Sequence, residues 1–252
     1  MLIKAKTLKG YKISGTDGDV GKVKEFYFDD QNWYIRYLVA DTGNWLTGKQ
    51  VLISPKALVA VNKETECIDI NLTKKQIGKS PMLNTDKPVS RQFELDYHDF
   101  FGWPVYWDDS LNPNVIQNLE QLYFPTQKEK QWDTHLRSTK DVSGHQIQAI
   151  DGEMGQVSDF IIDDVNWIIR YMIIDTKSWW VGKKVLVSSK WIEQISWKES
   201  KIFVNLSLES IKQSPEFSEE ELLTRDYEAQ LHKYYNRNVY WLEVPSNMNQ
   251  KL

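Results

Sequence analysis

Two short acidic segments carry side chains that could hold a hard cation. Each offers two carboxylates and one amide: Asp29, Asp30 and Asn32 in the first, and Asp163, Asp164 and Asn166 in the second. Calcium prefers such oxygen ligands, but neither segment has the twelve-residue acidic pattern of a dedicated calcium loop. Asp and Asn side chains also accept hydrogen bonds from nearby backbone N–H groups in turns. We therefore predict two structural turns and no metal site, with weak calcium binding as the alternative.

Residues 43–49 have the glycine and lysine spacing of a phosphate-binding loop. Such a loop needs Ser or Thr after its lysine to hold magnesium, and a helix whose N-terminal N–H groups face the phosphates. Gln50 occupies the position after the lysine, and the residues that follow it are typical of a strand. The pattern therefore predicts a turn, and we expect the protein to use no cofactor.

Two arginines, Arg36 and Arg170, stand among apolar residues that predict buried strands. A buried guanidinium needs a carboxylate partner, because an unpaired buried charge is costly. Asp41 and Asp175 stand near the ends of the same strands and are the expected partners. We predict two structural ion pairs.

No spacing in the chain assembles an acid, a base and a nucleophile. A hydrolytic enzyme would have to combine Asp41 or Asp29 with Asp175 or Asp163. The two histidines in equivalent positions on predicted helices are His98 and His232. Each lacks a second ligand four residues on, which favours surface or helix-packing histidines over a zinc site. We predict no catalytic residue and no enzyme activity.

Short strands separated by turns must position these residues. Apolar alternation predicts strands at 11–13, 23–28, 33–40, 51–54, 57–62 and 67–72. Asp17-Gly18 predicts a hairpin turn, because glycine supplies the backbone conformation that tight turns need. The strand at 33–40 is apolar on both faces, which indicates the interior of a barrel or sandwich. The predicted fold class is mainly β, with a small, partly closed barrel.

A helix is predicted after the strands, at residues 90–101. Its apolar stripe is formed by Phe93, Tyr97, Phe100 and Phe101. Later in the chain Ser218 and Glu221 have the spacing of a capping box at the start of an equivalent helix. Each helix is therefore expected to form a tail that follows the strands.

The sequence contains two copies of this arrangement of strands and helix. A shift of 134 residues aligns Gly10 with Gly144 and Trp107 with Trp241 without a gap, which indicates two copies of one folding unit. We predict domains at 1–107 and 135–241, a linker at 108–134 and a C-terminal tail at 242–252. Structural roles are assigned to recurring residues: Gly18, Gly21, Arg36, Asp41 and Gly48, and Gly152, Gly155, Arg170, Asp175 and Gly182.

Composition excludes several classes of protein. A hydrophobic share of 41% and a charged share of 26% are typical of a globular protein. The net charge is −4 without a clustered basic surface, which disfavours a nucleic-acid partner. The single cysteine, Cys67, excludes a disulfide framework within the chain and indicates a reducing compartment. No secretory signal or membrane span is recognisable, so we expect a cytoplasmic protein.

The chain resembles the PRC-barrel family, a small β-barrel also found in the cytoplasmic domain of the photosynthetic reaction-centre H subunit and in a ribosome-maturation factor. The motifs that carry the resemblance are Asp17-Gly18-x-x-Gly21-x-Val23, Asp29-Asp30, Trp33-x-Ile35-Arg36-Tyr37 and Trp45-x-x-Gly48-Lys49. The chain is also similar to bacterial PRC-barrel proteins in which the barrel is followed by a Tyr/Phe-rich helix ending Gly102-Trp103-Pro104-x-Tyr106-Trp107. The resemblance implies two tandem PRC-like barrels, each followed by a short helical tail.

The second copy departs from this pattern at three places. Ser189 replaces Pro55, Lys177 replaces Gly43, and Asn236-Arg237-Asn238 replaces Gly102-Trp103-Pro104. These changes leave the barrel intact as an expectation, but they argue against a role that needs two identical tails. The family consists mostly of assembly and docking modules, and a fold alone does not fix function.

Six tryptophans are candidate contacts for a partner, because large aromatic side chains in loops and tails often dock other proteins. They are Trp45, Trp179 and Trp180 in the loops before Gly48 and Gly182, and Trp103, Trp107 and Trp241 in the tails. Packing of a tail on its barrel, or of barrel on barrel, is the alternative explanation.

We therefore predict a non-enzymatic protein-interaction or assembly module that binds a protein partner. A small-ligand or metal-ion binding protein is the alternative. A scaffold like the reaction-centre H subunit or the ribosome-maturation factor is the third possibility. Intramolecular pairing of the two barrels and formation of a homodimer both stay open.

Overall fold

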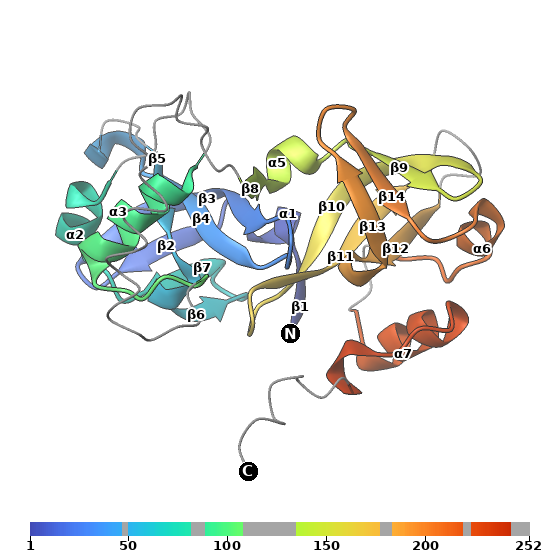
Figure 1. Cartoon of the computed structure of the whole chain (residues 1–252). Coiled ribbons are helices and arrows are strands. Elements are labelled where there is room, and N and C mark those ends of the chain that lie inside the picture. The colour runs from blue at the N-terminus through green and yellow to red at the C-terminus, as the bar shows by residue number, and fades with distance from the viewer. Residues whose placement is uncertain (47–49, 82–88, 108–134, 177–182, 219–222, 243–252) are drawn as a thin grey trace, which may run out of the picture. The chain divides into compact units, whose positions relative to one another are not determined.

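Figure 1 shows the computed structural model of the chain, which describes residues 1–46, 50–81, 89–107, 135–176, 183–218 and 223–242. Two compact units are present: the first unit is Thr7–Lys140, and the second unit combines Met1–Lys6 with Asp141–Leu252. None of the described helices is both long enough and apolar enough to cross a membrane.

The first unit contains a seven-stranded sheet. In spatial order its strands are β5 (Gln50–Ile53), β4 (Ile35–Asp41), β3 (Gly18–Asp29), β2 (Lys12–Gly15), β7 (Cys67–Ile70) and β6 (Leu58–Asn62), while β8 (Leu136–Ser138) also pairs with β3. The short helices that begin in residues 5–101 are α1 (Ala5–Leu8), η1 (Gly43–Leu46), η2 (Pro55–Ala57), α2 (Lys74–Lys79) and α3 (Arg91–Phe101).

The second unit repeats this topology. Its strands in spatial order are β12 (Lys184–Ser188), β11 (Ile168–Asp175), β10 (Gly152–Asp163), β9 (Gln146–Ala149), β14 (Lys201–Val204) and β13 (Ile192–Ser196), while β1 (Leu2–Lys4) also pairs with β10. Its helices are α5 (Thr139–Val142), η3 (Ser189–Trp191), α6 (Leu208–Lys212), α7 (Arg225–Tyr234) and η4 (Tyr240–Leu242). The predicted fold class, mainly β with two similar halves, is confirmed.

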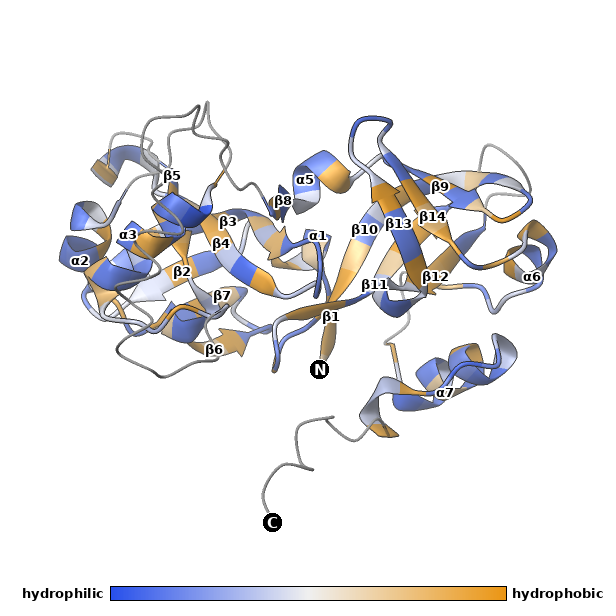
Figure 2. Cartoon of the chain, in the orientation of Figure 1, coloured by the Kyte–Doolittle hydropathy of each residue, from blue (hydrophilic) through white to orange (hydrophobic). Residues whose placement is uncertain are grey.

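The core of each unit comes from the strands. Figure 2 shows apolar residues concentrated along them, and polar residues over most of α7. Phe26, Phe28 and Tyr37 are fully buried in the first unit, as are Phe160 and Tyr171 in the second. Strand β4 has four consecutive buried residues, as a strand covered on both faces requires.

The predicted hairpin turn is present in both units. Residues Gly15 and Gly18 pair across it, so β2 and β3 are joined by a two-residue loop. The carboxylate of Asp17 in this loop accepts a hydrogen bond of 2.7 Å from the N–H of Lys74, the first residue of α2. Asp151 makes the equivalent bond of 2.8 Å to the N–H of Leu208. The aspartate therefore ties the hairpin to the N-terminus of the following helix.

Gly21 and Gly155 allow a close approach of two strands. A Cβ atom on Gly21 would lie 2.1 Å from the carbonyl oxygen of Asp41, and one on Gly155 would lie 2.3 Å from that of Asp175. No larger residue fits without moving the backbone. These two glycines recur because the end of β4 or β11 touches the long strand beside it.

The units divide the sequence differently from the predicted domains. Strand β1 belongs by sequence to the first repeat, but it pairs with β10 of the second unit. Strand β8 belongs to the second repeat, but it pairs with β3 of the first unit. The domain boundaries at 1–107 and 135–241 did not anticipate this exchange, and the linker predicted at 108–134 lies outside the described residues.

Candidate functional site

The tail helices α3 and α7 are positioned by their caps and their buried faces. Ser90 caps α3 by accepting the N–H of Phe93, and Gly102 ends the helix in the left-handed conformation that favours glycine. Thr224 caps α7 in the same way. The capping box predicted at Ser218 and Glu221 does not start α7, which begins at Arg225, and Glu221 lies outside the described residues.

A buried carboxylate lies at the centre of the contact between α3 and the sheet. Glu94 is fully buried and accepts hydrogen bonds from the hydroxyls of Tyr106 at 2.8 Å and Tyr37 at 3.1 Å. Nε2 of His135 lies 2.9 Å from the second carboxylate oxygen. Burial, followed by the nearby Glu94 charge, raises the pKa of Tyr37 and of Tyr106. The tyrosines therefore remain neutral donors to the carboxylate.

His98 completes this network from the next turn of α3. It is 2% exposed, with Nδ1 at 3.0 Å from the Pro104 carbonyl oxygen and Nε2 at 3.1 Å from the Tyr37 hydroxyl. Burial lowers its pKa, because the charged form loses its hydration. The two ring nitrogens of His98 face the Pro104 carbonyl of the tail and the Tyr37 hydroxyl of the sheet. The histidine thus fastens the end of the tail to the sheet.

The second unit contains the same network with one difference. The Tyr171 hydroxyl donates to Glu228 at 2.9 Å and lies 2.9 Å from Nε2 of His232. Nδ1 of His232 lies 2.7 Å from the Asn238 carbonyl oxygen. His135 has no histidine counterpart, because Met1 occupies the aligned position. The network recurs and is buried in both units, so it holds each tail on its sheet.

The strand arginines pair with a different aspartate from the one predicted. Nη2 of Arg36 lies 2.7 Å from Asp29, and Nη2 of Arg170 lies 2.9 Å from Asp163. Asp41 instead accepts the N–H of Gly43 at 3.0 Å. The pairing with Asp41 and Asp175 was wrong because the chain reverses after β3 and brings the acidic residue at the end of that strand opposite the arginine.

The closing Tyr-Trp pair of each repeat covers two arginines. Tyr106 lies over the guanidinium of Arg36, whose central carbon is 3.6 Å from the ring centre. Trp107 lies over Arg91 at 4.2 Å. In the second unit the equivalent contacts are Tyr240 over Arg170 at 4.0 Å and Trp241 over Arg225 at 4.5 Å. These cation–π contacts explain why the pair recurs.

The acidic loops use their oxygen atoms locally. Asp29 accepts the N–H of Asn32 at 2.6 Å, and Asp163 accepts the N–H of Val165 at 3.1 Å. Trp33 and Trp167 both have a positive φ at the end of these turns. In the part of the chain that the structure describes, no three carboxylate, histidine or cysteine side chains lie close enough to hold a metal ion.

The tryptophans predicted to contact a partner have different surroundings. Trp45 is 36% exposed, and its indole N–H donates to the carbonyl of Val20. Trp103 is partly buried against Tyr97, while Trp241 is 37% exposed. Trp107 is partly buried over Arg91. The other two predicted tryptophans, Trp179 and Trp180, lie outside the described residues, as do the glycines Gly48 and Gly182.

An aromatic surface is formed at the C-terminal end of α3. We call it the α3 aromatic surface and define it by Phe100, Phe101 and Trp103. Phe100 is 42% exposed and meets the edge of Phe101 at 4.9 Å, and Trp103 stacks on Phe101 at 4.6 Å. Two exposed carboxylates, Asp96 and Asp99, stand on the same helix beside Phe100.

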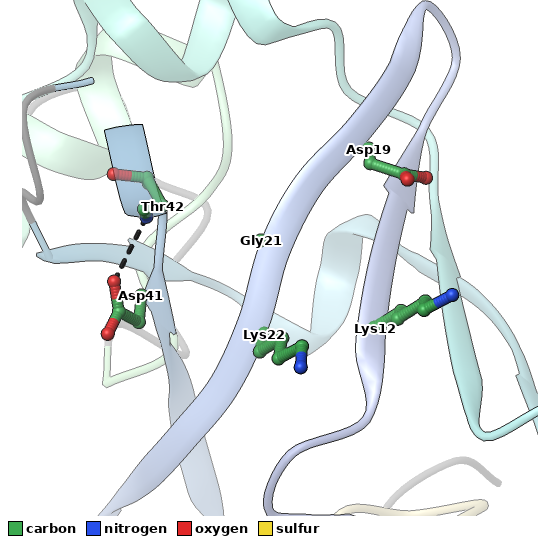
Figure 3. A pocket seen from close by; sticks show the side chains of 7 residues that line it. Lys12, Asp19, Gly21, Lys22, Asp41 and Thr42 are labelled. Carbon is green, nitrogen blue, oxygen red and sulfur yellow. Dashed lines mark hydrogen bonds between the residues drawn. The ribbon is translucent and has the colours of Figure 1, made fainter. Parts of the chain in front are cut away.

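A shallow pocket of about 370 Å³ lies at the end of β4 in the first unit. Figure 3 shows Gly21 on the long strand between Asp41 and Lys12, and all three residues line the pocket. The other charged residues that line it are Asp19 and Lys22. The pocket therefore combines two cations with two anions.

Comparison with known protein families supplies the identity of the first sheet. Residues 2–77 match the family model of the PRC-barrel domain. The chain contains a PRC-barrel domain. The resemblance noted in the sequence is thereby confirmed for one domain, while no curated protein matches the chain.

The PRC-barrel domain and the first unit do not coincide. The matched sequence begins at Leu2 and includes β1, yet the place beside the end of β3 is filled by β8. The match also ends within α2, before the tail helix. Glu94, His98 and the α3 aromatic surface therefore lie outside the matched domain.

Sequence reasoning missed the residues at the centre of the network. Tyr37 and Glu94 recur as Tyr171 and Glu228 at the constant shift of 134 residues, so a search for recurring buried polar pairs could have found them. His135 has no such counterpart, and only the exchange of β8 brings it to the first unit.

Proposed function

We propose that this chain is a non-catalytic assembly protein built from two PRC-like barrels, each with a helical tail, and that its first tail docks another protein. The observation that carries the proposal is the α3 aromatic surface, where Phe100 is exposed beside Phe101 and Trp103. Exposed contiguous aromatic side chains are typical of protein interaction sites.

The second repeat supports a specific role for the first tail. Its equivalent residues are Tyr234, Tyr235 and Arg237, which add hydroxyls and a charge. The Tyr234 hydroxyl donates to the backbone carbonyl of Ser210 at 2.7 Å. The phenylalanine at the equivalent position in the first tail has no hydroxyl that could make such a bond.

The charge beside the aromatic surface defines the class of partner. Asp96 and Asp99 flank Phe100 on exposed positions of α3. A segment that presents apolar side chains next to lysine or arginine would bury its apolar part on the aromatic rings and pair its charges with these carboxylates. The proposed partner is therefore a protein with a basic, apolar docking segment.

Site-specific photo-crosslinking tests the proposal. A photoreactive amino acid replaces Phe100 in one full-length protein and Tyr234 in a matched control, and both are expressed in native cells. We expect one protein to be captured through position 100 and not through position 234. Its binding to the purified chain should fall at least about tenfold with Phe100→Asp, since such a loss is typical of an interface hot spot. Equal capture at both positions would contradict the proposal.

The pocket beside Gly21 supports a second candidate function, the binding of a small ligand with an anionic group. Lys12 and Lys22 supply the positive charges. The second repeat has Gln146 and Gln156 at these two positions, so the double variant Lys12→Gln and Lys22→Gln gives the first pocket the second repeat's side chains. A compound library screened by thermal shift should give ligands that stabilise the native chain but not the double variant. A screen without such a compound would remove this candidate.

A further inference from the structure

Strands β1 and β8 occupy equivalent positions in the two repeats, yet each pairs with the long strand of the other repeat. Leu2, Ile3 and Lys4 pair with Asp163, Ile162 and Ile161 of β10. The residues shifted by 134, Leu136, Arg137 and Ser138, pair with Asp29, Phe28 and Tyr27 of β3. The two pairings have the same register, so the exchange is reciprocal.

Each exchanged strand completes an edge that the receiving repeat leaves open. Strand β10 pairs with β9 only through residues 152–156, and β1 lies along the rest of that edge at residues 161–163. Strand β3 is shared in the same way between β2 and β8. The side chains of Phe28 and Ile162 are fully buried there. Loss of the exchanged strand would break these backbone hydrogen bonds and uncover an unpaired sheet edge.

Polar side chains fix both exchanged segments. The N–H of Lys6 donates to the two oxygens of Asp159, at 3.2 and 3.3 Å. In the first unit the Ser138 hydroxyl donates to Glu25, and Thr139 accepts the N–H of Phe26 at 3.3 Å. The acceptor carboxylates stand at aligned positions, since Glu25 and Asp159 differ by 134. The segments are thus held by the receiving strand through specific bonds.

Apolar side chains add to these bonds. Ile3 is 6% exposed and Leu136 is 4% exposed. Ala5 and Thr139, which follow the two strands, are each 2% exposed. Burial of these side chains favours the exchanged arrangement in both directions.

We propose that this reciprocal exchange is an association interface, through which one repeat binds another without needing a covalent connection. Each repeat supplies the strand that the other requires, so the partner of this interface is a second copy of the same kind of repeat. Exchange of an identical element is a low-cost route to association, because the same set of strand contacts is used twice, once in each direction. The covalent chain between the repeats would then serve to raise their effective concentration.

Cleavage of the full-length protein tests the interface directly. A protease recognition sequence is introduced within residues 108–134, the folded protein is cut, and its mass is measured by native size-exclusion chromatography with light scattering. We expect the two fragments to elute together at the mass of the intact chain and to separate in urea. Separate elution under native conditions would overturn the proposal.

A crossed pair of variants distinguishes strand exchange from any other contact between the fragments. Ile3→Asp and Leu136→Asp are made in the full-length chain, and amide hydrogen exchange is followed strand by strand. Ile3→Asp should speed amide hydrogen exchange roughly tenfold or more in β10 and leave β3 unchanged. Leu136→Asp should speed it in β3 and leave β10 unchanged. Ile3→Val serves as the control and should leave both strands protected. Faster amide hydrogen exchange in β3 after Ile3→Asp would refute the proposed strand exchange.

Discussion

Replacement of Glu94 by glutamine tests whether the buried carboxylate holds the first tail on its sheet. The side chain keeps its shape but loses the charge that accepts the Tyr106 and Tyr37 hydroxyls and faces His135. A hydrogen bond to a charged group contributes about 1.5–3 kcal/mol, against about 0.5–1.5 kcal/mol for a neutral one. A loss of about 1 kcal/mol at each of three contacts gives roughly 3 kcal/mol.

The second unit provides the matched comparison. Glu228→Gln weakens the bond to Tyr171 at 2.9 Å and the ion pair with Arg225 at 3.0 Å. Arg225 has a side chain that is 60% exposed, so solvent screens this pair. No histidine stands at the position equivalent to His135. We therefore expect a smaller loss, roughly 1–2 kcal/mol.

Urea denaturation followed by tryptophan fluorescence gives the free energy of unfolding of both variants. Glu94→Gln should also lower the Tm by roughly 6–12 °C at this chain length. Glu64→Gln, which changes an exposed turn residue, is the control and should shift stability by less than about 0.5 kcal/mol. The reasoning fails if Glu94→Gln is as stable as the control, or if Glu228→Gln proves the more damaging change.

Three further changes probe the structural residues. Gly21→Ala should lower the free energy of unfolding by about 2 kcal/mol or more in chemical denaturation, because its Cβ would lie 2.1 Å from a backbone carbonyl oxygen. Gly78→Ala is the control: there is room for its Cβ, and the change should be neutral or stabilising. Arg36→Met should cost about 3 kcal/mol, since it leaves the buried Asp29 carboxylate without its guanidinium, and an unchanged Tm would contradict the ion pair. The pKa of His98 is lowered in the folded state, so below about pH 6.5 the unfolded chain binds a proton more readily than the folded chain does. The free energy of unfolding should therefore be highest above pH 6.5 and should fall as the pH drops below this value. This pH dependence, measured by thermal denaturation, should be weaker in His98→Gln, and an unchanged slope would exclude the histidine.

Most of the fold could be predicted from the sequence because it depends on local patterns. Alternating apolar residues and the Asp17-Gly18 turn predicted the strands. The aromatic stripe predicted a helix at 90–101, which the structure has at Arg91–Phe101. The exchange of β1 and β8 could not be predicted in this way. Leu2 and Leu136 are the same residue in equivalent positions, so the apolar pattern is satisfied equally well by either long strand.

The candidate site was predicted less completely. Recurring residues marked Arg36 as part of a buried ion pair, but Asp29 lies across a turn, and its position depends on the positive φ of Trp33. Sequence separation favoured Asp41 because it follows on the same strand. The aromatic tail was predicted, whereas the burial of Glu94 became visible only when the helix was packed on the sheet.

The exchanged strands also set an order of events during synthesis on the ribosome. Leu2 is made before its partner Asp163, which follows 161 residues later, since 163 − 2 = 161. At about 5–20 residues per second, this interval is roughly 8–30 seconds. The edge of β3 that pairs with β8 likewise stays unpaired until β8 has been made. The nascent chain therefore carries an unpaired sheet edge until translation has entered the second repeat.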